Sequence, residues 1–155
     1  MELKDFKKEY ERLAKKYKMP EFNELNKDFE IDKLDKDTDN LLRAIRKVIM
    51  EKVVNSMSFL EMLVNPVNAP RMYLPFIQTM SIEDRKAIDN IYSSLADLSL
   101  LSLELEISSL EEEEAKLIKT SFSKWNELKP LFKQILQNIK KPRSFVNRKE
   151  RSYFG

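Results

Sequence analysis

The chain has 155 residues, of which 42% are hydrophobic and 35% are charged, and its formal net charge is +2. It contains no histidine and no cysteine, and its single glycine is Gly155. These absences exclude zinc fingers, thiol nucleophiles and histidine-based triads, together with the glycine-rich loops that bind phosphates. The length suits one domain with its own core. Charged residues at the N-terminus and the lack of a long apolar run predict a soluble, cytoplasmic protein without a membrane span.

The first part of the chain carries a helical spacing of apolar residues. The chain has no Asn-Gly or Asp-Gly turn, which argues against tight hairpins and for an all-α fold. The first predicted helix ends near Pro20, and a short one follows over residues 21–27. A long third helix is predicted to begin at a capping residue and to end at the proline-rich loop 65–70. The candidate caps are Asp37, Thr38 and Asp39.

Residues 71–80 predict a short helical segment bent at Pro75. Its apolar side chains either plug one end of the bundle or form a docking surface, and burial is the commoner fate of such residues. They are Met72, Tyr73, Phe76 and Met80. Ser81 and Asp84 then have the spacing of a capping box that opens the next helix.

Residues 101–107 alternate between apolar and polar, which is a strand pattern. Leucine and glutamate favour helices, however, so we expect this stretch to be helical and buried on several sides, with Leu98, Leu100 and Leu101 in contact with neighbours. A strand paired with residues 29–31 is the alternative.

The last helix is predicted to begin at Ser108 or Ser109. Four glutamates at 111–114 follow, and we expect them to be solvated in the first turn, where the helix dipole favours acidic residues. Pro130 is expected to kink this helix or split it in two. The predicted buried face consists of Ile118, Phe122, Trp125, Leu128, Phe132, Ile135 and Ile139.

The predicted architecture is therefore a single-domain helical bundle of about four main helices with short extra helices. It occupies residues 1–141, and a basic and aromatic C-terminal tail occupies residues 142–155. No internal repeat divides the chain.

Catalytic chemistry has few candidates in this composition. Glu104 and Glu106 are two residues apart, so a helix points them to different faces. The glutamates at 111–114 lack the Glu-x-x-His spacing of di-metal bundles, because the chain has no histidine. No serine lies in a strained nucleophile turn of the known type. We expect a protein that is not an enzyme and that uses no metal, cofactor or small-molecule substrate.

Two basic features are the predicted binding sites. Residues 140–155 carry a net charge of +5 against −3 for the rest of the chain, and their rings could stack on bases or fill a pocket. The residues concerned are Lys140, Lys141, Arg143, Phe145, Arg148, Lys149, Arg151, Tyr153 and Phe154. A second set lies on the first helix at intervals of four residues, where like charges repel: Lys4, Lys8, Arg12 and Lys16.

These features predict a non-enzymatic protein that docks on RNA or on a ribonucleoprotein such as the ribosome. The alternative is a protein–protein adaptor, or a subunit of a larger assembly, in which the tail rings anchor a protein partner. If the basic stripe of the first helix and the tail emerge on one face, RNA binding is favoured. If the largest exposed patch is apolar, the adaptor is favoured.

Overall fold

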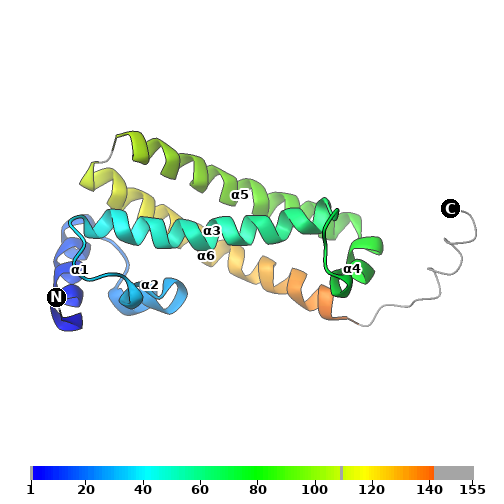
Figure 1. The fold of residues 1–155 in the computed structure, drawn as a ribbon, viewed down its shortest axis with the longest axis horizontal. Coiled ribbons are helices and arrows are strands. Elements are labelled where there is room, and N and C mark those ends of the chain that lie inside the picture. Colours follow the sequence, from blue (N-terminus) through cyan, green and yellow to red (C-terminus); the bar gives the residue numbers. More distant parts are fainter. Residues whose placement is uncertain (1, 109, 142–155) are drawn as a thin grey trace, which may run out of the picture.

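Three long helices form the body of the protein in the computed structural model, which describes residues 2–108 and 110–141. They are α3 (Leu41–Val64), α5 (Ile82–Ile107) and α6 (Glu111–Lys140), and each packs against the other two along the long axis of the molecule (Figure 1). Within the described residues no strand forms, which confirms the predicted all-α bundle. The predicted domain boundary after residue 141 coincides with the last described residue, so it stays a prediction.

Two shorter N-terminal helices, α1 (Leu3–Tyr17) and α2 (Phe22–Phe29), lie against one end of the bundle (Figure 1). A 3-10 turn, η1 (Ile31–Lys33), follows α2. Both helices end in the left-handed conformation that glycine usually occupies, with φ of 55° at Lys18 and 50° at Glu30. Because the chain has no internal glycine, ordinary residues take these positions, at a cost of roughly 1–2 kcal/mol each.

The start of α3 differs from the prediction by one to three residues. Asn40 is the N-cap, and its side-chain Oδ1 accepts a hydrogen bond of 3.0 Å from the backbone N–H of Arg43. Asp37, Thr38 and Asp39, which were the predicted caps, lie in the preceding loop. Asparagine is as good a cap as aspartate, so the composition of this segment left the choice open.

The connection between α3 and α5 contains η2 (Arg71–Tyr73) and α4 (Leu74–Gln78). Phe76 is buried, and Tyr73 is half-buried against the core. These two residues confirm that the segment closes one end of the bundle. Met72 is the exception, because 71% of it is exposed.

The helix α5 begins with the predicted capping box. The side chain of Ser81 accepts a hydrogen bond from the N–H of Asp84, and the carboxylate of Asp84 accepts one from the N–H of Ser81. Residues 101–107 continue this helix, so the helical prediction is confirmed. The predicted burial on several sides is wrong for Leu100 and Leu101, which are exposed.

The helix α6 is continuous through Pro130, so the predicted split does not occur. Its N-cap is Leu110, without a side-chain cap, rather than Ser108 or Ser109. The missing cap is offset by glutamates in the first turn, which interact favourably with the positive end of the helix dipole.

Trp125 lies on the predicted apolar face of α6, where it is half-buried against the core, and its ring lies 5.9 Å from that of Phe29. We expect Trp125→Ala to lower the free energy of unfolding by about 2 kcal/mol, less than the ~3–5 kcal/mol typical of a fully buried aromatic residue. Urea denaturation monitored by circular dichroism measures this change. A loss above about 4 kcal/mol would contradict the partial burial.

Candidate functional site

Most of the predicted tail site lies outside the described residues. This applies to Arg143, Phe145, Arg148, Lys149, Arg151, Tyr153 and Phe154. Of the two described tail residues, Lys140 is the last residue of α6 and Lys141 is its C-cap, and both are exposed. The role of the tail therefore stays a prediction.

The predicted basic stripe of α1 is exposed along its length, but two of its four cations already pair with acidic residues. Arg12 forms an ion pair of 2.7 Å with Glu9. Lys16 pairs with Glu111 of α6 at 3.1 Å. The stripe is therefore a weaker anion-binding surface than its sequence suggests. The other two members, Lys4 and Lys8, form no ion pair with the described residues.

The basic stripe and the start of the tail lie at opposite ends of the molecule. The helix α1 packs beside the start of α6, and the contact between Lys16 and Glu111 fixes it there. The last turn of α6, with Lys140, lies at the far end near α4 (Figure 1). The basic stripe and the described residues Lys140 and Lys141 are therefore separated by the length of α6.

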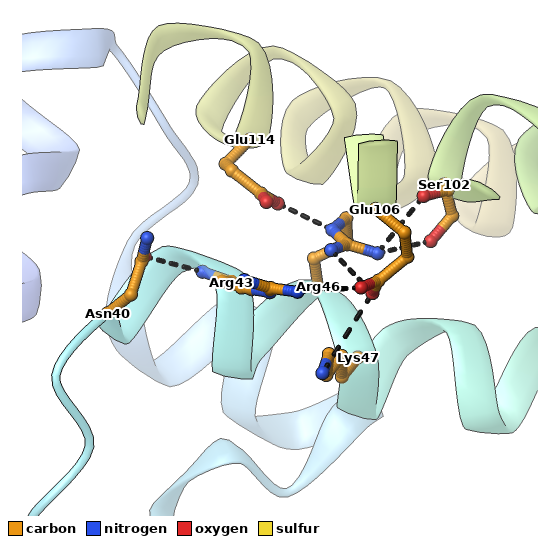
Figure 2. A network of polar contacts seen from close by, with 7 residues as sticks. All are labelled: Asn40, Arg43, Arg46, Lys47, Ser102, Glu106 and Glu114. Atoms are coloured by element: carbon orange, nitrogen blue, oxygen red, sulfur yellow. Dashed lines mark hydrogen bonds and ion pairs between the residues drawn. The ribbon is translucent and has the colours of Figure 1, made fainter. Parts of the chain in front are cut away.

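A polar network connects the three long helices at the end of the bundle near α1. Arg46 of α3 is buried, and each guanidinium nitrogen donates to a partner (Figure 2). Its Nε lies 2.5 Å from a carboxylate oxygen of Glu114, and its Nη2 lies 2.9 Å from Glu106. Its Nη1 lies 2.6 Å from the hydroxyl of Ser102. Every guanidinium nitrogen therefore has a partner, and Arg46 ties α3 to both α5 and α6.

Glu114 corrects the prediction that the glutamates at 111–114 are solvated. It is 0% exposed, whereas its three predecessors are exposed. The sequence contained a signal for the burial of each of the two charges, although not for their pairing. Arg46 follows Ile45 and precedes Ile49 by three residues, and Glu114 precedes Ile118 by four, so both charges lie on apolar helix faces.

Glu106 completes the network at the surface. It accepts a hydrogen bond of 2.7 Å from Arg43, and Lys47 lies 3.9 Å away. Hydrogen bonds from Arg43 and then Arg46 lower the pKa of Glu106 from its ordinary value of 4.5 to about 2. The carboxylate therefore stays ionised and interacts with three cations, Arg43, Arg46 and Lys47. A carboxylate held ionised in this way stabilises the structure and is poorly suited to act as a general acid.

This low pKa predicts a pH-dependent contribution to stability. A depressed carboxyl pKa stabilises the fold above the ordinary value of 4.5, and this contribution disappears as the pH falls to about 2. We expect wild type to be more stable than Glu106→Gln at pH 7, and the difference to shrink between pH 4.5 and about 2. Thermal melts of both proteins across this range measure the difference. A difference that is constant with pH would contradict the shifted pKa.

The most distinctive surface feature was not predicted as a site: an exposed apolar face on the second half of α5. We call it the leucine face. It consists of Leu100, Leu103, Ile107 and Leu110, which are 59%, 60%, 89% and 62% exposed. The first three are spaced by three and four residues, so they form one outward ridge on α5, and Leu110 follows in the turn to α6.

The same outward side of α5 is polar earlier in the helix. Lys86, Asp89, Ser93 and Asp97 precede Leu100 at intervals of three or four residues, and all four are exposed. The change from polar to apolar on one continuous face shows that the helix does not need outward leucines in order to fold. The outward leucines do not belong to the buried core of the chain.

The leucine face lies within an acidic part of the chain. Residues 87–115 contain eight aspartates and glutamates and no lysine or arginine. Asp97 and Glu104 flank Leu100 at three residues before and four residues after it, and both are exposed. Glu112 and Glu113 are exposed just beyond Leu110.

A groove of about 590 Å³ lies between α2, α3 and α6. The ammonium of Lys52 lies over the rings of Phe29 and Trp125, at 5.5 and 5.2 Å from their centroids. Asp28, which lines the groove, forms an ion pair of 2.7 Å with Lys129 of α6. These cations are used to hold α2 against the bundle, so they act as structural groups.

No group of three or more acidic side chains among the described residues is arranged to hold a metal ion. None of the described helices is long and apolar enough to cross a membrane. Comparisons of the chain with protein families, with curated proteins and with solved structures find no match.

Proposed function

We propose that this chain is a non-enzymatic helical adaptor that binds a protein partner through the leucine face. One observation carries the proposal: three large apolar side chains, Leu100, Leu103 and Ile107, form an exposed ridge on α5, and Leu110 is exposed at the start of α6. Contiguous exposed apolar patches on folded proteins often mark interaction sites, whereas single exposed apolar side chains are common and need no explanation. Burying one such side chain contributes about 1.5–3 kcal/mol, so four are enough to anchor a partner.

The position of the face also supports a docking role. The side chains belong to α5, whose inward side is fixed by buried residues of the bundle, including Leu98 and Leu105. A preformed, rigid surface loses little conformational entropy when it binds. The Arg46 network holds the same turns of α5 through Ser102 and Glu106, so the core directly positions the face.

The test is site-specific photo-crosslinking in a lysate of the source cells. A photoreactive residue at Leu103 should capture a defined protein, and the capture should survive nuclease and should disappear when Leu100 and Ile107 are changed to Ser. The matched control is a photoreactive residue at Ile82, which is 71% exposed at the other end of α5. Equal capture from both positions, or capture that nuclease abolishes, would reject the adaptor.

RNA binding through the tail is the second candidate, because residues 140–155 combine a charge of +5 with three aromatic rings. Replacing Arg143, Arg148, Lys149 and Arg151 with Gln should then weaken RNA binding and flatten its salt dependence by up to about four counterions. A salt titration with total RNA measures this. Changing the three tail rings to Ala should mainly impair binding to a protein pocket instead. Salt-independent RNA binding would reject the candidate.

The cytoplasmic location also stays a prediction.

A further inference from the structure

We propose that the partner segment recognised by the leucine face is a cationic amphipathic helix, an inference that rests on the proposed function. The four apolar side chains specify the contact, and the acidic residues around them specify the charge of the partner.

The shape of the face favours a helix. Leu100, Leu103 and Ile107 form a straight ridge about 10 Å long, which is two helical turns. Such a ridge packs into the groove between side chains of a second helix. A partner helix with apolar residues at positions i, i+3 or i+4, and i+7 would cover the ridge.

The charge of the surroundings favours a basic partner. Asp97 and Glu104 lie beside the ridge, and Glu112 and Glu113 lie beyond its end. Residues 87–115 contain no lysine or arginine, so Asp97 and Glu104 have no cation within one turn on α5. Glu112 and Glu113 have Lys116 within one turn on α6, so Asp97 and Glu104 determine the charge beside the ridge. Lysines or arginines that flank the apolar residues of a partner would meet these carboxylates at the rim of the contact, where charge complementarity selects partners and accelerates association.

A second copy of this chain fits less well. Suppose that the leucine faces of two copies met. All the charged residues of segment 87–115 are acidic in both copies, so acidic side chains would face acidic side chains however the two helices were aligned. Like charges that face each other across an interface disfavour association. An anionic lipid surface is disfavoured for the same reason.

The test uses the full chain and three synthetic peptides of about 18 residues, long enough to form a helix. All three carry the same leucine pattern, with Lys, Gln or Glu at the other positions. Fluorescence anisotropy measures their binding at low and at moderate salt. We expect the Lys peptide to bind at least about tenfold more tightly than the Glu peptide, with the advantage shrinking as salt rises.

Three variants locate the binding. The double variant Leu103→Ser, Ile107→Ser should bind the Lys peptide about tenfold or more less tightly than wild type does. The double variant Asp97→Asn, Glu104→Gln should have a lower affinity for the Lys peptide and an unchanged affinity for the Gln peptide. Ile82→Ser, at the other end of α5, should change neither. Since all five side chains are exposed, circular dichroism should show every variant folded as wild type.

Each other outcome overturns the inference. The Gln or Glu peptide could bind as tightly as the Lys peptide or more tightly, with this binding lost in the Leu103→Ser, Ile107→Ser variant. That result would reject a cationic partner but would still support the leucine face as the docking site. Self-association of the full chain by sedimentation, lost in the leucine variant, would identify a second copy as the occupant. Lys-peptide binding that the leucine variant leaves unchanged would show that the peptide sits elsewhere. No binding and no self-association would reject both the inference and the proposed function.

Discussion

Replacing Glu114 with Gln should lower the free energy of unfolding by about 3 kcal/mol, because it removes the charge that compensates a buried arginine. Arg46 is 1% exposed and Glu114 is 0% exposed, so water cannot replace the lost partner. Glu106 still pairs with Arg46 at 2.9 Å, which places the expected loss at the lower end of the ~3–5 kcal/mol range for broken buried pairs. Urea denaturation at pH 7 measures it.

Two controls separate the buried charge from other effects. Glu9→Gln removes the same charge from the exposed pair with Arg12 and should change the stability by less than about 0.5 kcal/mol. Replacing both buried partners, with Arg46→Met and Glu114→Leu together, should recover much of the loss, since apolar side chains of similar volume need no compensating charge. A double variant no more stable than Glu114→Gln would contradict this explanation.

The helical elements could be predicted because local chemistry determines them. The apolar spacing of α1, the proline-rich end of α3 and the Ser81–Asp84 capping box each act over a few residues. The cap of α3 was missed because several neighbouring residues could cap, and the structure uses Asn40. The N-cap of α6 is Leu110, whose side chain caps nothing, so no local capping preference indicates this start.

Burial was harder to predict, because it depends on which helices become neighbours. Arg46 and Glu114 are 68 residues apart, and no local pattern pairs them, although both lie on apolar helix faces. Residues 101–107 show the converse. Their leucines favour a helix, but the bundle covers only one side of α5, so Leu101 and Leu103 remain exposed, as does Leu100 just before them. The candidate site was therefore found in the structure and not in the sequence.

Truncating Tyr10 to Ala should also destabilise the protein by about 3–5 kcal/mol. Tyr10 is 0% exposed, its ring lies 5.6 Å edge-on from that of Phe22, and its hydroxyl donates a 2.7 Å hydrogen bond to the carbonyl of Pro20. It therefore joins α1 to the turn and helix that follow. Tyr10→Phe keeps the ring and loses the hydrogen bond, so it should cost only about 1 kcal/mol.

Hydrogen exchange shows where that loss falls. In Tyr10→Ala the amides of α1 should exchange faster than in wild type, while those in the centres of α3 and α5 should keep most of their protection, because α1 packs on α2 and α6. A uniform loss of protection across all helices would mean instead that α1 and the bundle unfold as one cooperative unit. In the first case binding at the leucine face should survive in Tyr10→Ala, since α5 keeps its buried contacts with α3 and α6.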